Sequence, residues 1–299
     1  MNSLKPLLYF SIFKYPLSAE EIYMFSPAAN KSEINDELEY LKKKGVVSID
    51  NSYYFLDGDI QSVTRRIEGN KMAKAVMDKA IKKGVFISKF PYIKGVGISG
   101  ALSKNYHDKD GDVDFFVITK PGRLWIARTL LMLYKKIFLF NSRKFFCINY
   151  FISESSLEIS EKNIFTATEL LTLIPVSGNF AEFYNKNQWV SEFLPNLEIG
   201  KPSIISKNKK SFLSRFIEFI LNSKIGNLLE LLFLRLTVKK WTTKFNTLSK
   251  EDFKIAMKST NGVSKHHPQN FQKKVIAKLN KKYNEFQSKY NIELEKEHA

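Results

Sequence analysis

The chain has 299 residues, of which 44% are hydrophobic and 26% are charged, and its formal net charge is +17. This composition is that of a globular protein, which excludes a disordered chain, and the length allows two or three small domains. The single cysteine, Cys147, excludes a disulfide framework and a cysteine-based zinc site. The absence of a disulfide framework predicts a reducing, cytoplasmic setting. No apolar run reaches the length of a membrane span.

The positive charge is concentrated in the C-terminal third of the sequence. Residues 201–299 contain 21 Lys and Arg against 8 Asp and Glu. Such a balance favours an anionic partner, which could be nucleic acid such as RNA, a phosphorylated substrate or an anionic membrane surface. The alternative is that these lysines only solvate the outer faces of helices.

The first 60 residues predict three helices followed by a β-hairpin. The helices are expected over residues 4–14, from Ser18 to about Phe25, and from about residue 31 to Gly45, with hairpin strands over 46–49 and 53–56. This order predicts a winged helix-turn-helix. Its third helix carries several acids, which repel phosphate, so we predict a packing or protein-contact role rather than sequence-specific DNA binding.

The next hundred residues alternate between helix and strand patterns. Helical spacing of apolar residues covers 65–90 and 123–140, and apolar strand-like runs cover 93–98, 115–118 and 144–152. The order helix, strand, strand, helix, strand therefore predicts a small α+β core built around a sheet.

Two polar motifs flank the first pair of core strands. Ser99, Gly100 and Ala101 form a turn after the first strand, where glycine lets the backbone approach an anion closely. Asp112 and Asp114 begin the second strand and alternate with Val113, so they are expected to share one face. Two carboxylates in an apolar sheet call for a divalent cation, and oxygen ligands suit Mg²⁺ or Mn²⁺. The alternative is a solvated acidic turn.

Helical patterns dominate the rest of the chain. They cover residues 163–173, 179–193, 212–245 and 271–295, with a Lys/Ser-rich linker at 199–211. Residues 228–241 read LLELLFLRLTVKKW, which could lie on a membrane with its basic end at lipid phosphates. A buried helix is the other interpretation of this segment. The expected location is therefore cytoplasmic, with attachment at the membrane periphery as an alternative.

The glycine turn, the spacing and the Asp-x-Asp pair resemble the DNA polymerase beta-type nucleotidyltransferase superfamily. The flanking segments resemble its small bacterial members that carry an N-terminal winged helix: PGRLWIARTLLMLY, CINYFIS, ATELLTLIPVSG, NQWVSEFLPN and a late HHP. The resemblance covers nearly the whole chain. It implies an α+β protein with a winged helix over residues 1–60, a mixed-sheet nucleotidyltransferase core over 61–160 and a helical region over 161–299.

The resemblance also implies a reaction. A nucleoside monophosphate would pass from a nucleoside triphosphate to an acceptor hydroxyl with release of pyrophosphate, and the acceptor could be a protein, an RNA or a small molecule. Asp112 and Asp114 would hold Mg²⁺ or Mn²⁺ and carry catalysis. The phosphates would lie against Ser99, Gly100 and Ala101, and the family's usual Gly-Ser pair is here Gly100-Ala101, so Ser99 or Ser103 would supply the hydroxyl.

Two further positions concern phosphate binding and the third carboxylate of the family. Arg123 and Arg128 follow the second strand and could reach a phosphate, or instead bond the C-terminal segment. The third strand has Asn149 where the family has a carboxylate, with Glu154 and Glu158 near its end. An amide cannot act as a base. The alternative function is therefore a catalytically degenerate nucleotide- or nucleic-acid-binding protein of the same fold.

Overall fold

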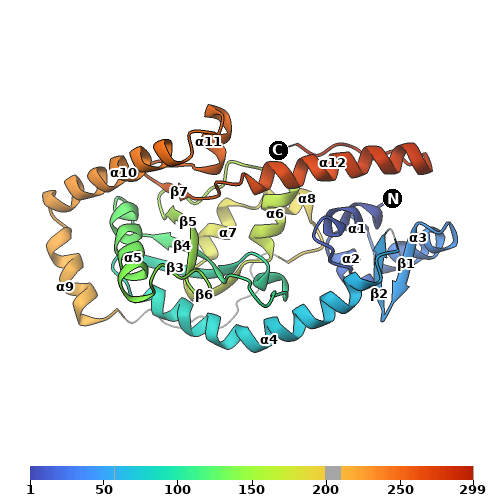
Figure 1. Ribbon diagram of the computed structural model, residues 1–299, viewed down its shortest axis with the longest axis horizontal. Helices are drawn as coiled ribbons and strands as arrows, with labels where there is room; N and C mark the ends of the chain where they lie inside the picture. The colour runs from blue at the N-terminus through green and yellow to red at the C-terminus, as the bar shows by residue number, and fades with distance from the viewer. Residues whose placement is uncertain (57, 199–209, 299) are drawn as a thin grey trace.

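The computed structural model describes residues 1–56, 58–198 and 210–298 (Figure 1). The chain forms a mixed α/β structure. A five-stranded sheet with helices on both faces occupies one part of the molecule, and a smaller helical region with a two-stranded hairpin lies at the other end. A long helix, α4 (Gln61–Ser88), runs between the two parts.

The N-terminal part contains the predicted three helices and hairpin. The elements are α1 (Leu4–Ser11), α2 (Ala19–Met24), α3 (Lys31–Lys43), β1 (Val47–Asp50) and β2 (Tyr53–Leu56). Helix α2 begins at a capping box, in which Ser18 accepts a hydrogen bond from the backbone of Glu21 and the Glu21 carboxylate accepts one from the backbone of Ser18. Strands β1 and β2 pair antiparallel, and Leu17 pairs with Tyr54 beside them.

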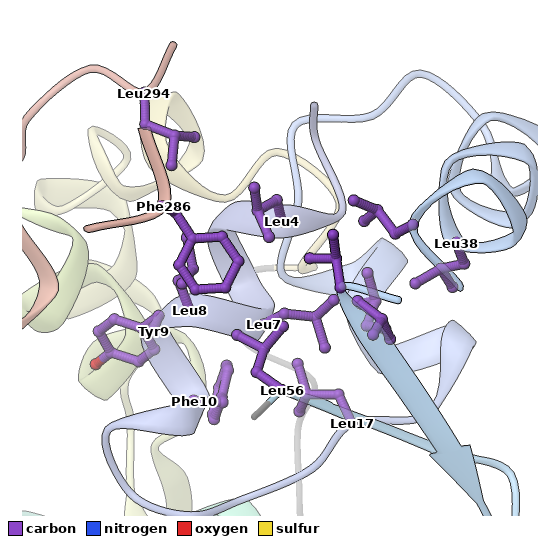
Figure 2. Packing of buried hydrophobic residues seen from close by; sticks show 14 of the residues in the cluster. Leu4, Leu7, Leu8, Tyr9, Phe10, Leu17, Leu38, Leu56, Phe286 and Leu294 are labelled. Atoms are coloured by element: carbon purple, nitrogen blue, oxygen red, sulfur yellow. The ribbon is translucent and has the colours of Figure 1, made fainter. Parts of the chain in front are cut away.

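The core of this N-terminal part includes residues from the end of the chain. Figure 2 shows leucines of α1 packed with Leu17, Leu38 and Leu56, and beside them Phe286 and Leu294. Phe286 belongs to the last helix, α12 (Phe271–Tyr290). Burying each such side chain contributes about 1.5–3 kcal/mol. The C-terminal segment is therefore part of the N-terminal core.

Arg66 fastens α4 to the N-terminal part. Its side chain is almost fully buried, donates to both carboxylate oxygens of Glu21 at 2.6 and 2.8 Å, and lies between the rings of Tyr15 and Tyr53. A bidentate arginine pair with stacked aromatic rings is a rigid connection. It fixes the first turns of α4 against α2 and the hairpin.

The sheet is mixed, as the sequence predicted. Its order is β6-β3-β4-β5-β7, with β4 and β5 parallel and the other pairs antiparallel. The strands are β3 (Ile93–Ser99), β4 (Asp114–Thr119), β5 (Cys147–Ser153), β6 (Ile174–Gly178) and β7 (Val263–Lys265). Both edge strands come from residues 161–299, so the C-terminal region, which the sequence predicted to be mainly helical, also contributes two short strands to the sheet.

Different helices cover the two faces of the sheet. Helices α4 and α5 (Leu124–Phe138) pack on the face that carries Phe115 and Val117, and the opposite face packs Phe116 and Ile118 against α6 (Ile164–Leu171), α7 (Ala181–Lys186) and α8 (Val190–Phe193). The short helix η1 (Leu102–Lys104) follows β3. These two layers leave the ends of the strands as the place where polar groups can meet.

The basic C-terminal third continues with three more helices before β7. They are α9 (Phe212–Leu221), α10 (Lys224–Lys244) and α11 (Lys250–Ala256). The helical pattern predicted over 212–245 corresponds to two helices with residues 222–223 between them, and the pattern predicted over 179–193 also corresponds to two helices. Within the described ranges of the chain, no helix is long and apolar enough to cross a membrane.

Candidate functional site

The glycine turn lies directly against Asp114. Strands β3 and β4 are antiparallel, and Ser99 at the end of β3 pairs with Asp114 at the start of β4. Gly100 has a φ of +70°, and a Cβ atom at this position would lie 2.6 Å from Oδ2 of Asp114. Only glycine combines this backbone conformation with so close an approach. The structure therefore places residues 99–101 and Asp114 at one point.

Asp112 lies beside this point but in a more solvated position. Val113 is fully buried, its N–H donates to the carbonyl of Lys144, and its carbonyl accepts the N–H of Cys147. Side chains alternate along such an extended segment, so Asp112 and Asp114 face away from the core that holds Val113. Asp112 is exposed and Asp114 is partly buried. The two carboxylates therefore have different electrostatic surroundings.

Asn149 forms the third side of the site. It is the extra residue of a β-bulge, because Phe115 pairs with Ile148 whereas Phe116 pairs with Tyr150. The Asn149 amide donates a hydrogen bond of 2.9 Å to Oδ1 of Asp114 and accepts one of 3.4 Å from the thiol of Cys147. An amide thus contacts Asp114 where the resemblance leads one to expect a carboxylate.

The other two candidates for the third carboxylate lie elsewhere. Glu154 follows the opposite end of β5, where its backbone N–H donates to Thr119. Thr119 is five residues along β4 from Asp114, a distance of about 16 Å in a strand. Glu158 is exposed and pairs with Lys162 at 3.0 Å. Of the three positions that the sequence left open, only Asn149 contacts Asp114.

The pKa of Asp114 reflects these neighbours. The pKa of its carboxyl group is raised from 3.8 to about 6: burial is the largest cause, the negative charges of Glu169 and Asp112 act in the same direction, and the interaction with Cys147 and the positive charge of Lys104 act against it. Burial also raises the pKa of the Cys147 thiol to about 12, so this cysteine is a neutral donor. A cation at Asp114 would offset the cost of the buried carboxylate.

Lys104 and Glu169 belong to the site although the sequence did not indicate them. Lys104, at the end of η1, donates to Glu169 of α6 at 2.7 Å and to the carbonyl of Gly100 at 3.1 Å. The same carbonyl accepts a hydrogen bond of 2.8 Å from Ser103. The glycine turn is therefore held from two sides. No local sequence signal predicts this pair, because its members are 65 residues apart.

The remaining predicted phosphate ligands differ in position. Ser103 lies at the turn, but its hydroxyl is bonded to Gly100 and lies 3.4 Å from the Thr172 hydroxyl, and Ala101 presents an exposed methyl group. Ser99 lies beside Asp114. These positions surround the aspartate, although the Ser103 hydroxyl already has internal partners.

Arg123 and Arg128 do not contact this site. Arg123 follows the far end of β4, where it donates to Asn227 of α10 at 2.8 Å. Arg128 lies over the ring of Trp241 of α10, with 4.7 Å between the guanidinium carbon and the ring centroid. Of the two roles considered from the sequence, the geometry matches bonding to the C-terminal segment. Phosphate binding by Arg123 and Arg128 stays a prediction.

The oxygen atoms at Asp114 fit a divalent cation of the Mg²⁺ class. Two carboxylates are hard donors, and Mg²⁺ in proteins is usually bound by one or two carboxylates together with water and substrate phosphates. Among the residues that the structure describes, no three His, Cys, Asp or Glu side chains converge as a closed metal cage. The donor set thus fits a cation that is shared with a phosphate-bearing ligand.

Comparisons of the chain with protein-family models, with characterised proteins and with solved structures found no match. The chemistry of this site is therefore the basis on which a function can be proposed.

Proposed function

We propose that the protein is a metal-dependent nucleotidyltransferase, which transfers a nucleoside monophosphate from a nucleoside triphosphate to an acceptor hydroxyl and releases pyrophosphate. The observation that supports this proposal best is the contact of the Gly100 turn with Asp114. It juxtaposes a backbone surface that a phosphate can approach with a carboxylate whose burial favours a cation. Asp112 adds a second carboxylate on the same side.

Each residue of the site then has a role. Asp112 and Asp114 hold the cation, and residues 99–101 receive the phosphates. A bound Mg²⁺ or Mn²⁺ supplies neutralisation of the charge on the transferred phosphoryl group. Lys104 orients the turn through its bond to the Gly100 carbonyl. The Asn149 amide fixes one oxygen of Asp114, which leaves the other oxygen facing Gly100.

Glu169 is the carboxylate that can replace the missing acid of β5. Lys104 bonds both Glu169 and the Gly100 carbonyl, so Glu169 lies near the glycine turn, and its negative charge contributes to the raised pKa of Asp114. In this proposal Glu169 accepts the proton of the attacking hydroxyl. General-base assistance of this kind contributes about 10²–10⁴-fold to a rate.

A second function is favoured by a specific observation. Asn149 contacts Asp114 with an amide, and by the family resemblance it replaces the third carboxylate as Ala101 replaces the usual serine, so the chain could bind a nucleotide or nucleic acid without transferring anything. Binding of a triphosphate with Mg²⁺ is common to both functions. Turnover distinguishes them.

The deciding experiment incubates the full chain with labelled nucleoside triphosphates, Mg²⁺ and a cell lysate that supplies protein, RNA and small-molecule acceptors. The Asp112→Ala/Asp114→Ala variant is the matched control. Label that enters an acceptor only with the unmodified chain supports the transferase. Equal incorporation by both proteins rules out this site as the catalytic one.

Calorimetry with a non-hydrolysable triphosphate, combined with the transfer assay, distinguishes the second function from the first. Binding that requires Mg²⁺, without transfer to any acceptor fraction, identifies a degenerate binding protein. A chain that binds no triphosphate in the presence of Mg²⁺ contradicts both proposals.

A further inference from the structure

Helix α9 places its polar side chains inward and its large apolar side chains outward. The hydroxyl of Ser214 donates to the backbone of Lys89, and the Glu218 carboxylate accepts the N–H of Tyr92 at 2.6 Å. The opposite side of the helix carries Phe212 and Phe219, which are 86% and 81% exposed. A helix on the water-exposed surface of a protein usually has its apolar side chains toward the core and its polar side chains toward the solvent.

Helix α10 continues the same arrangement. Its inward Glu230 is buried and accepts the backbone N–H groups of Trp125 and Ile126 at 2.8 and 2.9 Å. Its outward side carries Leu228, which is 68% exposed. We call the exposed apolar residues of both helices the α9–α10 face: Phe212, Leu213, Phe216, Phe219, Ile220, Ile225, Leu228, Leu231, Leu232 and Leu236.

The sequence left open whether residues 228–241 form a buried helix or a membrane-surface helix. Only one side of α10 is buried, where Leu229, Phe233 and Leu234 pack against the core of the sheet and α5. Exposed apolar side chains that stand singly are ordinary, but two consecutive helices that together expose ten large apolar side chains are typical of an interaction surface.

The charges on these helices indicate which partner fits the patch. Six cations on α9 and α10 are exposed: Arg215, Lys224, Arg235, Lys239, Lys240 and Lys244. None of them forms an ion pair with another described residue. The only acids of the two helices, Glu218 and Glu230, are both engaged with backbone N–H groups of the sheet layer. The outer surface of α9 and α10 therefore combines apolar side chains with positive charge and has no exposed acid.

We propose that the α9–α10 face docks the protein onto a membrane surface that carries anionic lipid. The apolar side chains would enter the boundary between headgroups and acyl chains, and the cations would contact lipid phosphates. A second copy of the chain fits less well, because its own α9–α10 face would bring six like charges against six. RNA would use the cations but leave ten apolar side chains in water. This inference does not depend on the proposed reaction.

The test is co-sedimentation of the full chain with vesicles of phosphatidylcholine mixed with phosphatidylglycerol, and with vesicles of phosphatidylcholine alone. Three proteins are compared: the unmodified chain, the variant Phe212→Gln/Phe219→Gln/Leu228→Gln, and the control Tyr40→Gln/Ile49→Gln/Ile60→Gln, which removes three exposed apolar residues of the N-terminal part. Circular dichroism verifies that all three proteins are folded. We expect them to be, because the substituted side chains are exposed.

We expect binding to the anionic vesicles that weakens with salt and is much weaker on phosphatidylcholine alone. The first variant should lose about tenfold in affinity for each side chain removed, whereas the control should bind like the unmodified chain. Absence of binding to anionic vesicles overturns the proposal. The proposal is also overturned if the first variant still binds the vesicles and polyuridylic acid displaces it, which would indicate an RNA surface. It is likewise overturned if the unmodified chain is a dimer in sedimentation velocity and the first variant is a monomer, which would indicate a surface between two copies of the chain.

Discussion

The side-chain amide of Asn149 donates a hydrogen bond of 2.9 Å to Oδ1 of Asp114. This contact joins a residue of a β-bulge in β5 to the first residue of β4, and it places a neutral donor where a second carboxylate would repel the aspartate. The bond also fixes one oxygen of Asp114, while the other faces the Gly100 turn. The properties of the site thus depend on which charges surround one carboxylate.

Replacing Asn149 by aspartate should convert the site into a stronger cation site. The Asn149→Asp variant would place two carboxylates within hydrogen-bond distance, so each raises the pKa of the other and both gain from a shared cation. We expect Mn²⁺ affinity to rise by about tenfold and stability without metal to fall. Calorimetric titration with Mn²⁺ measures the first effect. The Asn149→Ala control, which adds no charge, should not bind more tightly than the unmodified chain. Equal affinities for Asn149→Asp and the unmodified chain would exclude a cation at Asp114.

Because the pKa of Asp114 is raised in the folded chain, the free energy of unfolding should depend on pH. The folded chain holds this proton up to about pH 6, whereas in the unfolded chain the group titrates near 3.8, so the folded state binds more protons in this window. Stability should therefore be highest below the lower value and decrease as the pH rises through about 6. The full cost is at most about 3 kcal/mol.

The Asp114→Asn variant tests this cost. It keeps an acceptor for the Asn149 amide but removes the charge. Without divalent cations it should be more stable than the unmodified chain at about pH 7, and the difference should vanish below the ordinary pKa of aspartate. Urea unfolding at several pH values measures the difference. Mg²⁺ should stabilise the unmodified chain and leave the variant unaffected. A pH-independent difference between the two would assign the effect to packing instead of charge.

A pair of glycine variants isolates the contact between the turn and Asp114. Gly100 and Gly122 have φ values of +70° and +66°, but a Cβ atom at Gly122 would meet nothing within 4 Å. Both Gly→Ala changes should cost about 1 kcal/mol in backbone strain. Gly100→Ala should cost more, because Asp114 must turn away and lose its bond to Asn149. Thermal unfolding gives the two costs, and only Gly100→Ala should weaken Mn²⁺ binding. The same cost for both variants would contradict the close contact.

The sequence predicted those elements that have a local signal, such as a capping residue or an alternation of apolar and polar residues. Ser18 was predicted to begin the second helix and caps α2, and alternation around Val113 predicted that Asp112 and Asp114 would share a side. The edge strands β6 and β7 have no such local signal. The first is five residues long and contains Pro175, and the second has only three residues, so each is a strand only because β3 or β5 offers a free edge to it.

The site was predictable to the same extent. Gly100 and Asp114 could be paired from the sequence because a turn and an acid at the ends of adjacent strands must meet. The Lys104–Glu169 pair depends on how α6 packs across the sheet, and the direction of Arg123 and Arg128 depends on where α10 crosses α5. Such contacts between distant segments are set by tertiary packing, which local periodicity does not encode.

Glu230 is the subject of the last prediction, because it connects α10 to the first turn of α5. It is 8% exposed, and its two carboxylate oxygens accept the N–H groups of Trp125 and Ile126 in the first turn of α5. These are among the N–H groups that a helix cannot satisfy internally, and a negative charge there also interacts favourably with the helix dipole. Glu230→Ala would leave two buried donors without partners, which should cost about 2–5 kcal/mol of unfolding free energy.

Two further variants make this measurement specific. Glu230→Gln keeps one acceptor oxygen and should lie between the alanine variant and the unmodified chain. Glu285→Ala removes an acid of α12 that is exposed and pairs with Lys281 only at 3.7 Å, so it should cost less than about 1 kcal/mol. Urea unfolding compares the three variants. If Glu230→Ala proves no more costly than Glu285→Ala, the N–H groups of α5 must find other acceptors, and α10 is then attached to the sheet layer by its apolar contacts alone.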